Sequence, residues 1–136
     1  PQLLINARTD ALRAFADRSD GLREAISRAN QYLQAGGDLA FICYAESLPE
    51  IETLVREIGG PISIAAGMPY NLRELSIEDL KSLGVARVSL PMLAITATTQ
   101  ALKSVMAYAA EPGGLARVAD EGLCCPLPET MAVARR

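Results

Sequence analysis

The chain contains no histidine and no tryptophan in its 136 residues. Without histidine it cannot by itself build a Ser-His-Asp or Cys-His catalytic site, or a histidine-ligated metal centre. Only three cysteines occur, Cys43, Cys124 and Cys125. An odd number without a framework spacing indicates a reducing compartment. We therefore expect a cytoplasmic location and structural or incidental roles for these cysteines.

Clustered positive charge and long apolar runs are absent as well. The chain has 13 Lys and Arg against 16 Asp and Glu, and its formal net charge is −3. No basic cluster exceeds two residues, so we expect no nucleic-acid partner. No apolar run approaches membrane-spanning length, and the first residues do not form a signal peptide, so we expect no membrane partner. Half of the residues are hydrophobic, which is typical of a globular domain with a real core.

What the chain does contain is a strand–helix unit that recurs along the sequence. Apolar runs predict strands at 3–7, 39–43, 61–66 and 85–90. Amphipathic spacing predicts helices at 21–35, from Ser47 to the Gly59-Gly60 pair, at 76–83 and at 95–110. Ser47 with Glu50, and Ser76 with Asp79, fit the capping-box pattern that starts a helix. This alternation favours right-handed crossovers and a parallel sheet.

These units predict an α/β fold that makes up the C-terminal half of a TIM-type β/α barrel. We assign residues 1–112 to this partial barrel and 113–136 to a C-terminal tail or arm. A complete barrel needs roughly 250 residues. The simplest interpretation is that the sequence is the second half of a longer protein, or a truncated product of one. No Gly-x-Gly-x-x-Gly or Walker-type loop follows a strand, which disfavours the usual nucleotide-binding folds.

The motif Asn6-Ala7-Arg8-Thr9-Asp10-Ala11 follows the first expected strand directly. Alternate side chains of a strand share a face, so Asn6 and Arg8 point the same way. Arginine at the end of an apolar strand needs an anionic partner, and its planar fork suits a carboxylate or a phosphate. That partner is either a bound anion or a structural ion pair, for example with Asp10.

Three segments resemble the isocitrate lyase / phosphoenolpyruvate mutase superfamily, in family order and at family spacing. They are residues 5–11, 25–38 and 83–91, and the similarity extends over most of residues 3 to about 110. The resemblance is strongest to members like methylisocitrate lyase and carboxyvinyl-phosphonate phosphorylmutase. It implies a β/α barrel with its active site at the carboxyl ends of the strands. It also implies cleavage or formation of a C–C or P–C bond beside a 2-oxo acid, through an enolate held on Mg²⁺.

The resemblance also implies roles for single residues. Arg8 matches the arginine that binds the carboxylate of the 2-oxo acid, and Asn6 is a second candidate substrate-binding residue. A glutamate that often ends the second strand aligns with Cys43, so either Glu46 replaces it or the feature is lost. Pro91 matches a proline that shapes the rim of the pocket, although it could equally just end the strand.

Much of the family's machinery has no counterpart in this sequence. The magnesium ligands and the loop with the catalytic cysteine belong to the first half of the barrel, so we assign no catalytic residue and expect the chain alone to be inactive. The leading hypothesis is part of a Mg²⁺-dependent lyase that cleaves a methylisocitrate- or dimethylmalate-like 2-hydroxy acid, in carboxylic acid metabolism. Its alternative is a truncated, non-catalytic half-barrel that assembles only as an oligomer. A third hypothesis is that the chain is an unrelated four-stranded α/β binding domain.

Family members form tetramers that exchange a C-terminal helix, so we expect a homo-oligomer. The segment from Thr98 to Ala110, followed by Glu111-Pro112-Gly113-Gly114, has the composition of such an arm with a hinge. Its apolar stripe fits either exchange or packing on its own barrel.

Overall fold

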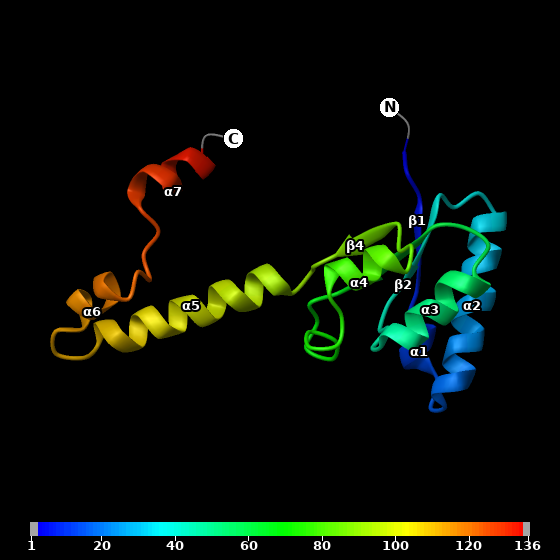
Figure 1. Cartoon of the computed structure of the whole chain (residues 1–136), viewed down its shortest axis with the longest axis horizontal. Helices are drawn as coiled ribbons and strands as arrows, with labels where there is room; N and C mark the ends of the chain where they lie inside the picture. Colours follow the sequence, from blue (N-terminus) through cyan, green and yellow to red (C-terminus); the bar gives the residue numbers. More distant parts are fainter. Residues whose placement is uncertain (1–2, 135–136) are drawn as a thin grey trace. The chain divides into compact units, whose positions relative to one another are not determined.

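The computed structural model describes residues 3–134 (Figure 1). The chain divides into two compact units, residues 1–93 and 94–136. The first unit carries all the strands of the described residues and the pocket discussed below, whereas the second is helical.

The first unit is a four-stranded parallel sheet with the strands in sequence order. The strands are β1 (Asn6–Thr9), β2 (Leu39–Ile42), β3 (Ile62–Ala65) and β4 (Arg87–Ser89). The helices between them are α1 (Ala11–Ala14), α2 (Arg18–Gln34), α3 (Leu48–Glu57) and α4 (Ile77–Ser82). The predicted α/β fold with parallel β/α units is confirmed.

The core lies between one face of this sheet and the helices. Ile42, Ile62 and Ile64 of the strands are buried together with Ile51 and Leu54 of α3. Alternation along each strand places every second side chain on this face. The intervening residues lie on the opposite face, which these helices do not cover, and that face carries the candidate site.

The largest displacements among the predicted boundaries are at the start of the first strand and the start of the first long helix. The first strand begins at Asn6 and not at Leu3, because the ladder to β2 starts where Asn6 pairs with Leu39. Leu3 is 87% exposed, outside the ladder. Helix α2 begins at Arg18, before the predicted start at Gly21, because the carboxylate of Asp17 accepts hydrogen bonds from the backbone N–H groups of residues 19 and 20 and caps the helix.

The two predicted capping boxes have different outcomes. Ser76 caps α4 as predicted, since its Oγ accepts a 3.0 Å hydrogen bond from the Asp79 N–H. Ser47 occupies the N-cap position of α3, but its side chain makes no capping hydrogen bond. Glu50 accepts the N–H of Glu46 instead, because its carboxylate is held by Arg18.

The second unit contains α5 (Leu93–Ala109), which begins in the first unit, α6 (Gly114–Asp120) and α7 (Leu127–Ala134). Within it, the Arg117 guanidinium lies 3.9 Å from the ring centroid of Tyr108 and forms ion pairs with Glu111 and Glu121. Among the described residues, no helix combines the length and the apolar character needed to cross a membrane.

Candidate functional site

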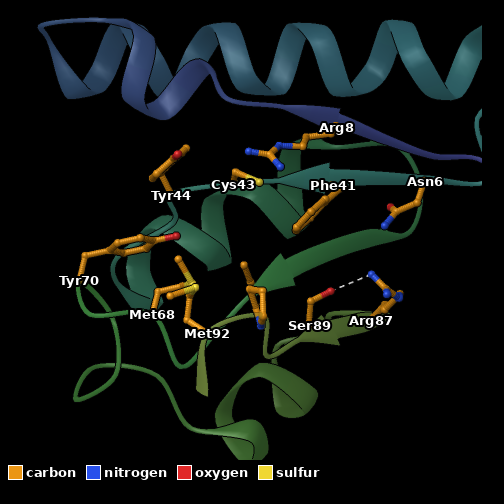
Figure 2. A pocket seen from close by; sticks show the side chains of 12 residues that line it. Asn6, Arg8, Phe41, Cys43, Tyr44, Met68, Tyr70, Arg87, Ser89 and Met92 are labelled. Carbon is orange, nitrogen blue, oxygen red and sulfur yellow. Dashed lines mark hydrogen bonds between the residues drawn. The ribbon is translucent and has the colours of Figure 1, made fainter. Parts of the chain in front are cut away.

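A pocket of about 460 Å³ opens on the sheet face opposite the core (Figure 2). The strand register sets Arg8 beside Phe41, Phe41 beside Ser63 and Ser63 beside Arg87, which forms one row across all four strands. Partners in a parallel ladder point to the same side, so this row faces the pocket. The interior of a β/α barrel is usually filled by branched apolar side chains. A row that begins and ends with arginine is therefore a candidate ligand-binding surface.

Arg8 is held in place by the next charged residue along the chain. Its Nε and Nη2 donate to the two carboxylate oxygens of Asp10, at 2.7 and 3.0 Å. This hydrogen bonding raises the pKa of Arg8 and lowers the pKa of Asp10. The guanidinium carbon also lies 5.9 Å from the centroid of the Phe41 ring. The Nη1 group and the second proton of Nη2 are not used by Asp10, and they form a second edge of the fork that suits another carboxylate.

The sequence left two interpretations of Arg8 open, a structural ion pair and a bound anion, and the structure shows that they do not exclude each other. The ion pair with Asp10 exists, and Arg8 also lines the pocket with 55% of its side chain exposed. A guanidinium fixed on one edge and open on the other is oriented before a ligand arrives, which lowers the entropy cost of binding.

Asn6 lies two residues before Arg8 on the same face and also lines the pocket. Its Oδ1 atom is buried and accepts no hydrogen bond from the described residues. An unsatisfied buried acceptor costs about 1–3 kcal/mol, so a donor supplied by a ligand would be stabilised there.

The sequence interpretation missed Arg87 as a site residue. Its Nη1 donates to the hydroxyls of Ser89 and Ser63, at 2.8 and 3.3 Å, and no carboxylate oxygen of residues 3–134 lies within 4.0 Å of it. The sequence did carry a signal. Arg87 stands inside an apolar strand, as Arg8 does, and Ser89 and Pro91 follow it at the spacing of one strand face.

The carboxyl end of β2 forms another wall of the pocket. Burial raises the pKa of the Cys43 thiol to about 11, so this thiol is protonated at neutral pH. Tyr44 adopts a left-handed backbone conformation with φ of 66°, uncommon for a residue other than glycine. Its ring lies 5.6 Å from that of Tyr70, and its hydroxyl accepts a 2.9 Å hydrogen bond from Arg13.

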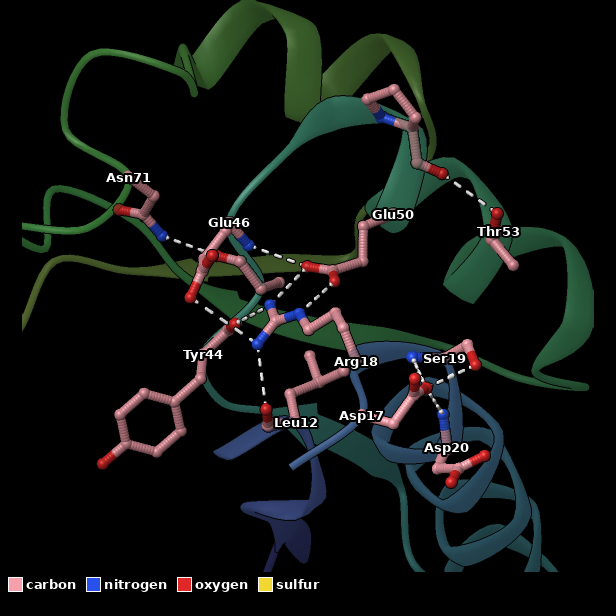
Figure 3. Close-up of polar contacts among 12 residues, drawn as sticks. Leu12, Asp17, Arg18, Ser19, Asp20, Tyr44, Glu46, Glu50, Thr53 and Asn71 are labelled. Carbon is pink, nitrogen blue, oxygen red and sulfur yellow. Dashed lines mark hydrogen bonds and ion pairs between the residues drawn. The ribbon is translucent and has the colours of Figure 1, made fainter. Parts of the chain in front are cut away.

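A polar network behind this wall fixes the loop after β2 (Figure 3). Arg18 donates to both oxygens of Glu50, at 2.6 and 2.8 Å, and to the carbonyl oxygens of Leu12 and Tyr44, at 2.9 and 2.5 Å. Glu46 lies 3.5 Å from Arg18 and does not line the pocket. Of the four predicted substrate-binding residues, the structure therefore brings together Asn6, Arg8 and Pro91 and directs Glu46 to Arg18.

The described residues suit an anion better than a cation. Residues 3–134 contain no group of three or more His, Cys, Asp or Glu side chains that could hold a metal ion. The carboxylate of Asp10, beside the pocket-lining Arg8, already binds that arginine. A magnesium ion does not fit these residues, and the chemistry that can be derived for them is binding of negative charge.

The sequence is also similar to known proteins. Residues 1–110 match the family model described as phosphoenolpyruvate phosphomutase. The chain is 38% identical over 91 residues to the uncharacterized protein Rv1998c of Mycobacterium tuberculosis, a match that covers 65% of this chain and 32% of that protein. The chain therefore spans about a third of the curated relative it matches.

Solved structures show the same fold at lower identity. An oxaloacetate acetylhydrolase bound to the inhibitor 3,3-difluorooxalacetate is 19% identical with a TM-score of 0.68, and the match covers 97% of this chain and 45% of that one. A 2,3-dimethylmalate lyase of the PEP mutase/isocitrate lyase superfamily is 20% identical with a TM-score of 0.64, covering 97% and 47%. Against these TIM-barrel proteins the four-stranded sheet is a partial barrel. From the match over residues 1–110, the chain belongs to the phosphoenolpyruvate phosphomutase family, within the PEP mutase/isocitrate lyase superfamily.

Proposed function

We propose that this chain provides the carboxylate-binding half of a carbon–carbon lyase active site. The substrate would be a 2-hydroxy di- or tricarboxylate similar to methylisocitrate or dimethylmalate, and a product would be a 2-oxo acid. The observation that carries the proposal is Arg8, which lines the pocket with one edge of its guanidinium on Asp10 and the other edge open. Family membership and a dimethylmalate lyase among the structural neighbours support the reaction class.

Arg8 would hold the carboxylate next to the bond that breaks. The open Nη1–Nη2 edge can donate to both oxygens of that carboxylate, while Asp10 keeps the guanidinium from rotating. Once the substrate hydroxyl has lost its proton, its carbon becomes the carbonyl carbon of the 2-oxo acid as the bond breaks. The electron pair of that bond passes to the other fragment, where negative charge develops as an enolate beside Arg8. A fixed positive charge beside it stabilises that charge without reorganising, which is how a preorganised site lowers a barrier.

The Oδ1 atom of Asn6 would accept a hydrogen bond from the substrate hydroxyl. This atom is the buried acceptor that lacks a partner among the described residues, and a 2-hydroxy acid brings an O–H donor next to its carboxylate. Pro91 would contribute to the rim of the pocket. A substrate contact of Glu46 stays a prediction, and it would require that this carboxylate leave Arg18.

Magnesium dependence is part of the proposal for the complete enzyme. Because the described residues do not form a metal site, no step is assigned to the ion within this chain. The proton acceptor for the substrate hydroxyl is likewise not assigned, since the pocket thiol of Cys43 is protonated at neutral pH.

The test is release of pyruvate or glyoxylate from a panel of 2-hydroxy di- and tricarboxylates in the presence of Mg²⁺. It is run on the chain and on any longer natural protein that contains it. Arg8→Ala is expected to lower kcat/KM at least about 100-fold, because it removes a charge-assisted bidentate contact to the reacting group. Arg73→Ala is the matched control, since Arg73 is exposed and does not line the pocket. In whichever of these proteins turns over, an equal kcat/KM of the Arg8 and Arg73 variants would exclude the assigned role.

An alternative proposal is a non-catalytic half-barrel that exists as a homo-oligomer. It is supported by the outer strands β1 and β4, each of which has a single strand neighbour among the described residues. Unpaired strand edges favour association. Light scattering combined with the activity panel separates the two proposals. An assembly of copies, with no turnover in the chain or in any longer natural protein that contains it, favours the alternative, and turnover in any of these forms favours the lyase.

A further inference from the structure

We propose that Arg87 is a second anion-binding residue of this pocket. The pocket would then take a ligand with two acidic groups, one bound by Arg8 and the other by Arg87. This inference rests on the proposed function, because it takes Arg8 as the site of the first carboxylate. It adds the residue that would bind the second acidic group of that ligand, which would be a carboxylate or a phosphonate.

The strand register puts the two arginines at the same level of the sheet. Arg8 pairs with Phe41, Phe41 with Ser63, and Ser63 with Arg87, so the row ends with an arginine on each outer strand. Arg8 and Arg87 thus stand on the two outer strands of the sheet, and both side chains line the same pocket.

Both side chains also lean in the same direction along their strands. Arg8 binds Asp10, two residues further on, and Arg87 binds Ser89, two residues further on. Each guanidinium is therefore directed toward the carboxyl end of the sheet. Figure 2 shows them on opposite sides of the pocket with Phe41 between them.

The two arginines have different partners, and those of Arg87 leave its charge uncompensated among the described residues. Arg8 already shares its charge with a carboxylate, whereas the partners of Arg87 within residues 3–134 are hydroxyl oxygens only. Ser63 is fully buried beneath Arg87, and together with Ser89 it engages Nη1 and fixes the side chain. The Nε and Nη2 protons stay open on the edge that binds a carboxylate or phosphonate in bidentate fashion. Among the described residues, no negative charge lies within 4.0 Å to compensate it.

The experiment is calorimetric titration of the chain with three probes at low ionic strength. Pyruvate has one acidic group, L-malate has two carboxylates, and phosphonoacetate has a carboxylate and a phosphonate. The unmodified chain is expected to bind at least one diacid more tightly than pyruvate. Equal affinity for all three probes would overturn the inference without reference to any variant.

The variants are Arg87→Gln, Arg87→Lys and the control Arg73→Gln, which makes the same charge change at an exposed position outside the pocket. Arg87→Gln is expected to weaken diacid binding by about 10- to 100-fold, the range for a hydrogen bond to a charged group, and to leave pyruvate affinity unchanged. Arg87→Lys should restore part of the loss because it keeps the charge but not the fork. An Arg87→Gln effect that is absent, or the same for pyruvate and the diacids, would overturn the inference.

A parallel titration of Arg8→Ala separates this inference from the proposed function. If Arg8→Ala weakens pyruvate binding while Arg87→Gln leaves diacid binding intact, the inference fails and the proposed function stands. If Arg8→Ala leaves pyruvate binding unchanged, the proposed function itself fails. A loss confined to malate or to phosphonoacetate in Arg87→Gln supports the inference and identifies the second group.

Discussion

Replacing Glu50 with glutamine removes the carboxylate around which the loops behind the pocket are organised. Its oxygens accept hydrogen bonds from Arg18 at 2.6 and 2.8 Å and from the backbone N–H of Glu46 at 2.8 Å. The Glu50 side chain is 10% exposed and that of Arg18 is 38% exposed. The ion pair raises the pKa of Arg18, principally through this hydrogen bonding. The pair joins the start of α2 to the first turn of α3.

The loss of unfolding free energy that we expect for Glu50→Gln lies between two limits. Breaking a fully buried ion pair costs about 3–5 kcal/mol, because the remaining charge is stranded. A hydrogen bond to a charged group contributes about 1.5–3 kcal/mol, and glutamine preserves part of one such contact. Because water reaches more than a third of the Arg18 side chain, part of the penalty is screened. We expect Glu50→Gln to lower the free energy of unfolding by about 2 kcal/mol.

The assay is urea unfolding followed by far-ultraviolet circular dichroism, with the slope against urea compared between variants. Glu24→Gln is the matched control, because Glu24 forms an ion pair with Arg28 within α2. The Glu24 side chain is 36% exposed against 10% for Glu50, so the loss of this pair should change the free energy of unfolding less. A double-mutant cycle with Arg18→Met isolates the coupling between Arg18 and Glu50. An equal loss of unfolding free energy in Glu50→Gln and Glu24→Gln would refute the reasoning.

Three further predictions concern single residues around the pocket. At pH 8 a thiol reagent should modify the other two, exposed cysteines rapidly and Cys43 slowly, because burial raises the pKa of Cys43 to about 11; equal rates would contradict this. Asn71→Ala should cost about 3 kcal/mol in urea unfolding, because its buried amide bridges two backbone carbonyls and one N–H. Arg8 lowers the pKa of Asp10, so the stability from this pair is present above the ordinary carboxyl pKa of 3.8 and is lost as the pH falls through the lowered value. Asp10→Asn should therefore reduce the fall in thermal stability in acid, and an unchanged pH profile would count against the pair.

Local pattern alone determined much of the fold. Apolar runs separated by amphipathic segments are sufficient to predict parallel β/α units, because a strand followed by a helix and a parallel strand is almost always a right-handed crossover. The shared face of Asn6 and Arg8 follows from the two-residue period of a strand, and the structure places both in the pocket. The helix start at Ser76 follows from its own side chain. Each of these features depends on residues that are close in the sequence.

Features that depend on partners distant in the sequence were decided by the tertiary structure. Glu50 fits a capping box with Ser47, yet it binds Arg18, 32 residues away, and that arginine also attracts Glu46 away from the pocket. Arg87 joins Arg8 in one row only because the register of three successive strand pairs brings them level. A sequence gives the spacing of side chains along each strand, whereas the offset between strands is set by packing against the helices. The sequence therefore determined which side chains could share a strand face, and only the assembled sheet decided that two arginines from its opposite edges line one pocket.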